Sequence, residues 1–143
     1  MFFFQTALAE AAVEFDDLAF IDRLWRDWSP GYVLPDAERA ALKETLRAPG
    51  VVTQILNYYR QLFTPPTDET AQALQARASG ALTVPSLYFH GADDNCISVK
   101  LSDNMNAAFT STFERIVVPD AGHFLHLEQP KTVAKHIVGF LNS

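Results

Sequence analysis

Residues 84–94 have the sequence Val-Pro-Ser-Leu-Tyr-Phe-His-Gly-Ala-Asp-Asp, and residues 119–130 have the sequence Pro-Asp-Ala-Gly-His-Phe-Leu-His-Leu-Glu-Gln-Pro. The first stretch opens with an apolar run rich in aromatic residues, with Pro85 near its start, where a strand tolerates proline. A second apolar, β-branched run at 113–118 leads into the second stretch. We therefore predict strands at 84–90 and 113–118, each followed by a loop that carries a titratable side chain.

The segments around these strands predict a parallel arrangement. A helix is expected at about 99–108, and a last helix from about Pro130 places Val133, Ile137, Phe140 and Leu141 on one side. A strand–helix–strand unit of this length normally forms a parallel pair, and continuous apolar runs are typical of parallel strands buried on both faces. Two parallel strands are not stable alone, so we expect them to be the edge of a larger sheet whose middle these 143 residues do not supply.

The first part of the chain has helical periodicity. Asp16 or Asp17 can cap a helix that ends at Ser29-Pro30-Gly31, a second is expected from Asp36 to about Arg47, and a third carries the apolar stripe at 52–63. The predicted order is three helices followed by β-α-β-α, which places the chain in the α/β class.

The loops after the two strands carry the candidate chemistry. Asp94 follows the first strand and His123 follows the second. Because parallel neighbours end at the same edge of a sheet, the two side chains are expected to meet there. A carboxylate beside an imidazole fixes the tautomer of the ring and stabilises the imidazolium, which suits a histidine used as a general base.

These motifs resemble the α/β-hydrolase superfamily. Residues 84–94 resemble the strand that delivers the triad acid in that family, and residues 119–130 resemble its histidine loop and the start of its last helix. The resemblance assigns the acid to Asp94 rather than Asp93, and the base to His123 rather than His126. It implies a partial α/β-hydrolase fold, with a helical lid at 1–80, the C-terminal β-α-β-α part of the core at 81–143, and the N-terminal half of the core absent.

The helical part is similar to lids of the epoxide hydrolase and haloalkane dehalogenase branch, in Trp-Arg-Asp-Trp-Ser-Pro at 25–30 and Ile-Leu-Asn-Tyr-Tyr-Arg at 55–60. In epoxide hydrolases a lid tyrosine in a similar stretch donates a hydrogen bond to the epoxide oxygen, and the matching residue is Tyr59. Packing on an apolar helical stripe is the simpler interpretation of Tyr59. Trp25 and Trp28 are expected to be lid core residues that also line the substrate pocket.

The nucleophile of such a triad is missing from the sequence. The nucleophile elbow commonly requires Gly-x-Ser-x-Gly, and no two of the glycines at 31, 50, 80, 91, 122 and 139 are four apart. The family order of nucleophile, acid and histidine places the nucleophile upstream of the lid. We therefore expect the chain alone to be inactive, and the parent to hydrolyse a small apolar substrate through a covalent intermediate. An Asp nucleophile would imply an epoxide or haloalkane, and a Ser nucleophile an ester, with Tyr59 favouring the epoxide.

The remaining features exclude other classes of function. The net charge is −6 and no cluster of Lys and Arg occurs, which disfavours nucleic acid and anionic membranes, and no apolar run could span a bilayer. One cysteine, Cys96, excludes an internal disulfide, and the N-terminus does not resemble a signal peptide, so a cytoplasmic location is expected.

We expect no cofactor and no metal, since His123, His126 and Glu128 alone do not supply ligands at metal spacing. An open sheet edge predicts self-association or a complementing N-terminal half. The alternative function is a non-catalytic binding module derived from the same fold, in which His123→Ala would leave function intact.

Overall fold

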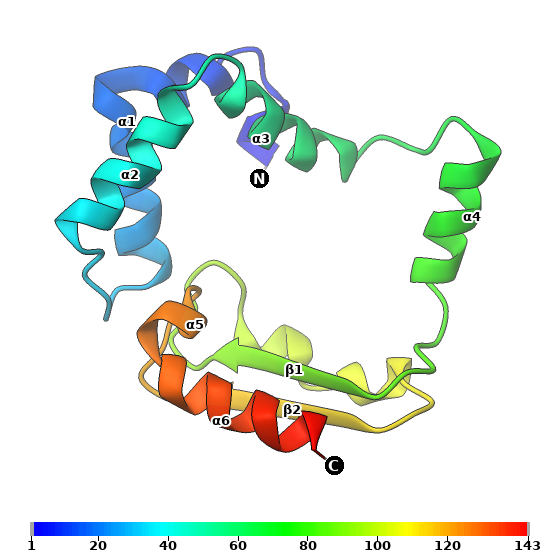
Figure 1. Cartoon of the computed structure of the whole chain (residues 1–143). Coiled ribbons are helices and arrows are strands. Elements are labelled where there is room, and N and C mark those ends of the chain that lie inside the picture. Colours follow the sequence, from blue (N-terminus) through cyan, green and yellow to red (C-terminus); the bar gives the residue numbers. More distant parts are fainter. Residues whose placement is uncertain (1, 143) are drawn as a thin grey trace. The chain divides into compact units, whose positions relative to one another are not determined.

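The computed structural model describes residues 2–142 and divides them into two compact units. The first unit comprises the residues up to Leu24 together with Leu34–Ala78, and the second comprises Trp25–Val33 together with the residues from Ser79 onwards. Figure 1 shows the elements in chain order, with helices first and two strands after them, so the predicted α/β class is confirmed. None of the helices between residues 2 and 142 is both long enough and apolar enough to cross a membrane.

The first unit is helical. Its elements are the short 3₁₀ helix η1 (Phe2–Gln5), most of α1 (Ala9–Trp28), α2 (Asp36–Arg47), α3 (Val51–Gln61) and α4 (Glu69–Ala78). The predicted helices at 36–47 and 52–63 match α2 and α3, while η1 and α4 were not predicted. The apolar residues of η1, α1, α2 and α3 form a core from Phe4, Ala9, Val13, Leu18, Leu46, Val52 and Leu56, to which α4 contributes no buried side chain.

Helix α1 is broken where the sequence predicted a helix to begin. Asp16, Asp17 and Leu18 have left-handed backbone conformations, with φ of 48°, 53° and 61°. The carboxylate of Asp17 pairs with Arg47 and with Lys43 of α2, and Lys43 also donates to Asp22 Oδ2 at 2.7 Å. A left-handed conformation is unfavourable for residues other than glycine. The ion pairs between α1 and α2, which lie side by side in Figure 1, offset that cost.

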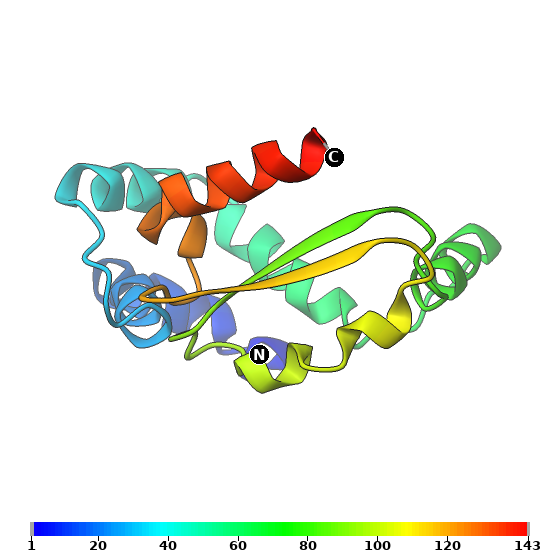
Figure 2. The ribbon, with the colours of Figure 1, turned by 90° about the horizontal axis from the view of Figure 1, so that it is seen from below.

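The second unit is a two-stranded parallel sheet with helices on both faces. Strand β1 (Ser86–Gly91) pairs with β2 (Phe113–Val118) in a register that sets Ser86 opposite Phe113 and Gly91 opposite Val118. Helix α6 (Pro130–Leu141) lies against one face of the sheet, and the segment that connects the strands lies on the other (Figure 2). The short helix α5 (Leu125–Glu128) joins the loop after β2 to α6. The sheet therefore has the layered, parallel arrangement that the sequence predicted.

The prediction of one α-helix between the two strands was wrong. Residues 99–108 form two short 3₁₀ helices, η2 (Val99–Ser102) and η3 (Met105–Ala108), rather than one α-helix. Ser102 Oγ donates to the carbonyl oxygen of Val99, and Arg115 of β2 donates to Ser102 Oγ, to the same Val99 carbonyl and to Asp103. The carbonyl oxygen of Val99, which would accept a backbone bond in an α-helix, accepts from these two side chains instead, and this competes with continuation of the helix.

Candidate active site

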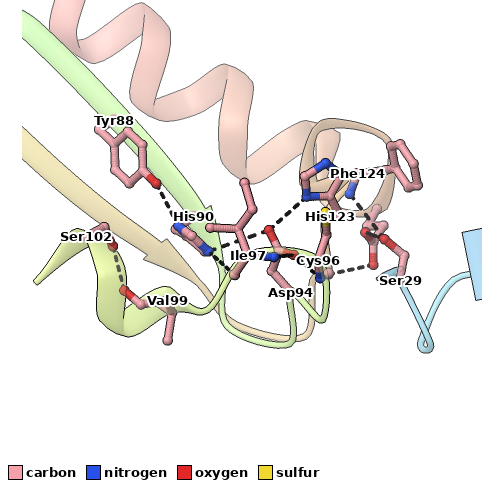
Figure 3. Close-up of polar contacts among 12 residues, drawn as sticks. Ser29, Tyr88, His90, Asp94, Cys96, Ile97, Val99, Ser102, His123 and Phe124 are labelled. Atoms are coloured by element: carbon pink, nitrogen blue, oxygen red, sulfur yellow. Dashed lines mark hydrogen bonds and ion pairs between the residues drawn. The ribbon is translucent and has the colours of Figure 1, made fainter. Parts of the chain in front are cut away.

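The side chains of Asp94 and His123 meet at the carboxyl ends of β1 and β2. His123 Nδ1 lies 2.9 Å from Asp94 Oδ2, and the two side chains are 27% and 6% exposed (Figure 3). An ionised carboxylate can only accept a hydrogen bond, so Nδ1 of His123 carries a proton and donates a hydrogen bond to Asp94. The pair can therefore hold His123 as the tautomer whose Nε2 is free to accept a proton.

Backbone donors hold the carboxylate of Asp94 on its other oxygen. The N–H groups of Cys96 and Ile97 donate to Oδ1 at 2.8 and 2.9 Å, so the side chain closes its own turn. Burial alone would raise the pKa of Asp94, but the hydrogen bonds from Ile97, His123 and Cys96 outweigh it and hold the pKa below its ordinary value of 3.8. Asp94 is thus a buried carboxylate that stays ionised at neutral pH.

Two glycines allow the loops to approach each other this closely. A Cβ on Gly91 would lie 2.1 Å from the carbonyl oxygen of Gly122 and 2.4 Å from that of Ala121. A Cβ on Gly122 would lie 2.6 Å from Ser29 Cα. Backbone bonds then join the loops, since Ala92 N–H donates to the Val118 carbonyl and Asp93 N–H to the Ala121 carbonyl, both at 2.9 Å. Asp93 contributes its backbone here, and Asp94 contributes its side chain.

Sequence reasoning missed a pair that holds the histidine loop, formed by the buried Ser29 and the half-buried Glu128. Ser29 is fully buried, and its Oγ donates to Glu128 Oε1 at 2.7 Å and accepts from Phe124 N–H at 3.1 Å. Glu128 Oε2 accepts from Gly122 N–H at 2.9 Å. These two side chains therefore fix the N–H groups of Gly122 and Phe124, on both sides of His123. Ser29 and Glu128 are 99 residues apart in the sequence.

The residue before Ser29 joins both loops through its backbone. The carbonyl oxygen of Trp28 accepts from His123 N–H at 3.1 Å and from Asn95 N–H at 3.4 Å. Trp28 is the last residue of α1 and Ser29 follows it, but both residues lie in the same unit as the two strands. The segment Trp25–Val33 is therefore part of the framework of the acid–histidine pair.

We expect Ser29→Ala to lower the free energy of unfolding by about 1 kcal/mol, because Phe124 N–H loses its acceptor and Glu128 loses a donor. A double-mutant cycle with Glu128→Gln, followed by urea denaturation, measures the coupling between the two side chains. Ser98→Ala is the matched control, since Ser98 is exposed and its hydroxyl makes no capping bond at η2. Additive effects of the two substitutions would contradict a coupled pair.

The predicted aromatic residues Trp25 and Trp28 surround the histidine loop. The ring of Trp25 stacks on Phe124, with centroids 3.7 Å apart and planes 19° apart. The ring of Trp28 meets His123 edge-on, with centroids 5.0 Å apart and planes 71° apart. Both rings are half-buried, so this part of the site offers apolar surface next to the imidazole.

Tyr59 belongs to the first unit, and the acid and the histidine belong to the second. Its ring packs on Phe4, with centroids 5.0 Å apart, and contributes to the helical core, as the simpler interpretation expected. It also lines an open, largely apolar groove of about 590 Å³ along the start of α3, with Pro49, Gly50, Val51, Gln54, Ile55 and Tyr58. Packing and a binding role are therefore both compatible with its position.

Cys96 is half-buried beside Asp94, and burial followed by the charge of that carboxylate raises the pKa of its thiol above the ordinary value of 9.0. The thiolate is the reactive form, so we expect iodoacetamide to modify Cys96 at pH 8 at least about tenfold more slowly than a free cysteine. Asp94→Asn removes the negative charge and should accelerate the reaction, while Asp93→Asn should not. Equal rates for both variants would contradict an influence of Asp94 on the thiol.

His126, His136 and Glu128 each have defined surroundings in the structure. His126 is exposed on α5, and His136 of α6 packs edge-on against Phe89 of β1. Both carboxylate oxygens of Glu128 bind protein groups. Within residues 2–142, no group of three His, Cys, Asp or Glu side chains is arranged to hold a metal ion.

Comparison with known proteins places this arrangement among proteins named as epoxide hydrolases. Epoxide hydrolase 1 of Caenorhabditis elegans is 26% identical over 149 aligned positions, which cover 99% of this chain and 34% of that protein. Epoxide hydrolase 3 of Xenopus tropicalis is 30% identical over 92 positions, which cover 64% of this chain and 23% of that protein. The chain thus spans about a third or less of the length of these relatives.

Solved structures give the same result for the fold. A protein from Klebsiella pneumoniae, provisionally assigned as an epoxide hydrolase, matches with a TM-score of 0.81 and 25% identity over 97% of this chain and 47% of its own. An epoxide hydrolase from Bacillus megaterium matches with a TM-score of 0.72 and 21% identity over 99% of this chain and 50% of its own. The predicted partial fold is confirmed, since the match covers about half of each structure.

The family model described as the alpha/beta hydrolase fold matches residues 10–130. That range includes nearly all of α1, the helices α2 to α5, both strands and the Asp94–His123 pair, and it ends where α6 begins. The chain therefore belongs to the α/β hydrolase fold family, and its similarity within that family is to epoxide hydrolases.

Proposed function

We propose that this chain supplies the acid and the base of a hydrolytic triad, with Asp94 as the acid and His123 as the base. The observation that carries the proposal is the 2.9 Å contact between His123 Nδ1 and the buried carboxylate of Asp94 at the ends of adjacent parallel strands. In an open α/β sheet this edge is where ligands bind. The low pKa of Asp94 keeps the charge that stabilises an imidazolium as His123 takes up a proton.

The reaction that fits the pair is hydrolysis through a covalent ester. A nucleophile on a segment outside these 143 residues attacks the substrate carbon and forms a covalent ester, while the bond from that carbon to the leaving oxygen or halide breaks. In an epoxide that oxygen stays on the substrate and takes a proton from an acid donor or from water to become a hydroxyl. His123 Nε2 then removes a proton from water, and the water oxygen attacks the ester carbonyl. The proton on His123 passes to the departing oxygen or to solvent as the product leaves and the nucleophile is restored. Similarity to proteins named as epoxide hydrolases favours an epoxide substrate over an ester or a haloalkane.

The proposal extends to the helices by resemblance. Residues 1–80 act as the lid, residues 81–143 as the C-terminal part of the core, and Tyr59 donates a hydrogen bond to the epoxide oxygen. The apolar lining of the groove beside Tyr59 and the exposed parts of Trp25 and Trp28 support a small, apolar substrate.

The proposed partner is a chain or segment that completes the sheet. Strand β1 pairs with β2 on one side only among the described residues, so its other edge carries unpaired backbone groups. A complementing N-terminal half would cover that edge and bring the nucleophile, and self-association would cover it without one. A cytoplasmic location remains part of the proposal, on the evidence of a single cysteine.

The test is turnover of a chromogenic epoxide and a chromogenic ester by the purified 143-residue chain, with His123→Ala as the reference. We expect no turnover above that of His123→Ala, because Gly-x-Ser-x-Gly is absent from the sequence. Turnover that disappears in His123→Ala would show that a nucleophile or activated water is present and would overturn the proposed incompleteness. Turnover that persists in His123→Ala would contradict the role of the pair and favour a non-catalytic module.

A further inference from the structure

His90 is a buried titratable side chain that the proposed reaction does not use. It precedes Gly91 at the end of β1, and its ring is 4% exposed. Its two ring nitrogens nevertheless have close polar neighbours, as Figure 3 shows: Tyr88 Oη lies 2.7 Å from Nδ1, and the carbonyl oxygen of Ile97 lies 2.9 Å from Nε2. A buried polar ring is unfavourable unless it is paired, so these contacts explain how a histidine is tolerated there.

The neighbours of His90 fix its tautomer. A backbone carbonyl can only accept a hydrogen bond, so the 2.9 Å contact with Ile97 requires a proton on Nε2. Nδ1 of the neutral ring is then an acceptor, and the hydroxyl of Tyr88 donates to it. The Nε2–H group also lies 3.5 Å from Asp94 Oδ2, the oxygen that accepts from His123.

Ile97 links His90 to the acid at a second point. Its N–H donates to Asp94 Oδ1 at 2.9 Å, while its carbonyl oxygen accepts from His90. One residue of the acid loop is thus held at its amide by the carboxylate and at its carbonyl by the buried ring. The strand, which is fixed in the sheet, thereby fixes the loop that aims Asp94.

We propose that His90 is a positioning residue for Asp94, one that orients the acid by anchoring Ile97 and by placing Nε2–H beside the oxygen that binds His123. This inference rests on the proposed function, because it assigns a role within the same site. Tyr88 has the supporting role of keeping the proton on Nε2 of His90. Removing the Nε2–H donor should let the acid loop shift and weaken the bond from His123 to Asp94.

The first measurement needs no substitution. Long-range ¹H–¹⁵N correlation spectra of the ¹⁵N-labelled chain report histidine tautomers through carbon-bound protons, at a pH where the imidazoles are neutral. We expect the Nε2–H tautomer for His90 and the Nδ1–H tautomer for His123. An Nδ1–H tautomer at His90 would overturn the proposal, because Nε2 could then not donate to Ile97.

The second measurement uses variants and reads out His123. His90→Phe fills the ring volume without a donor, and His90→Gln keeps an amide donor near the position of Nε2. We expect the minor Nε2–H tautomer of His123 to rise about tenfold in His90→Phe and to return towards the wild-type value in His90→Gln. His136→Phe, a histidine replaced on α6 against Phe89, is the control and should change nothing.

Each outcome decides the proposal. An unchanged His123 tautomer in His90→Phe, or equal effects of His90→Phe and His90→Gln, would show that His90 only fills space. Should His90→Phe fail to fold, Tyr88→Phe gives the test, with a mixture of tautomers expected at His90. Turnover is not the readout, so failure of the proposed hydrolase activity and failure of the positioning role are observed separately.

Discussion

Replacing Gly91 with alanine is expected to lower the free energy of unfolding by about 3 kcal/mol, the upper end for an overpacked buried site. The added Cβ would lie 2.1 Å from the Gly122 carbonyl oxygen and 2.4 Å from the Ala121 carbonyl oxygen. These atoms are backbone and cannot swing aside, so the loops after β1 and β2 must separate. Separation would also break the backbone hydrogen bonds between the Asp94 and His123 loops. The hydrogen bond between Asp94 and His123 would then be lost as well.

Gly139→Ala is the matched control for this substitution. Gly139 lies inside α6, and beyond its chain neighbours and the backbone of its own helix no described atom lies within 4 Å of a Cβ built there. Alanine is favoured over glycine in a helix, so this change should raise the free energy of unfolding by about 0.5–1 kcal/mol. Urea denaturation followed by circular dichroism measures both values. A Gly91→Ala protein within about 1 kcal/mol of the wild type would contradict the close approach of the two loops.

Asp94→Asn is expected to lower the free energy of unfolding by about 2 kcal/mol at pH 7, because charge-assisted bonds from His123, Cys96 and Ile97 are replaced by weaker or mismatched ones. The pKa of Asp94 is lower in the folded chain than its ordinary value of 3.8. The ionised carboxylate therefore stabilises the fold fully above pH 3.8, and this contribution is lost as the pH falls through the lower, folded-state pKa.

The expected signature is a pH-dependent difference between the wild type and Asp94→Asn. The difference in free energy of unfolding should shrink as the pH falls below 3.8, through the lower folded-state pKa of Asp94. Asp93→Asn is the control, because Asp93 is exposed and binds Ala121 through its backbone N–H. A difference that grows as the pH falls below 3.8 would reverse the sign and contradict the direction of the Asp94 pKa.

The parts of the fold that could be predicted from sequence are those with local signals. The bounds of α2 and β2 match their predicted ranges, since α2 begins at Asp36 after a proline and β2 is a continuous β-branched run between loops. The segment at 99–108 has a helical pattern, but its 3₁₀ form depends on Arg115, which reaches back from the next strand. A pattern read along the chain does not contain that contact.

The residues of the candidate site also fall into those that the sequence predicts and those that it does not. Asp94 and His123 could be predicted to meet because strand ends and parallel pairing are readable from sequence, and their contact follows from those two facts. Ser29 and Glu128 could not, because a serine in a Ser-Pro-Gly stretch predicts only the end of a helix. The burial of Ser29 and its bond to Glu128 depend on packing between segments 99 residues apart.

The carbonyl of Trp28 has a consequence for building chimeric enzymes. Because it binds the backbone on both sides of the site, at Asn95 and at His123, residues 25–33 belong with the strands although residues 25–28 are the last turn of α1. A helical cassette exchanged between relatives should therefore be cut at Leu24 and Leu34, the borders of the two units, and not at the end of α1. Junctions placed at Trp28 would import a foreign segment into the framework of the acid and the base.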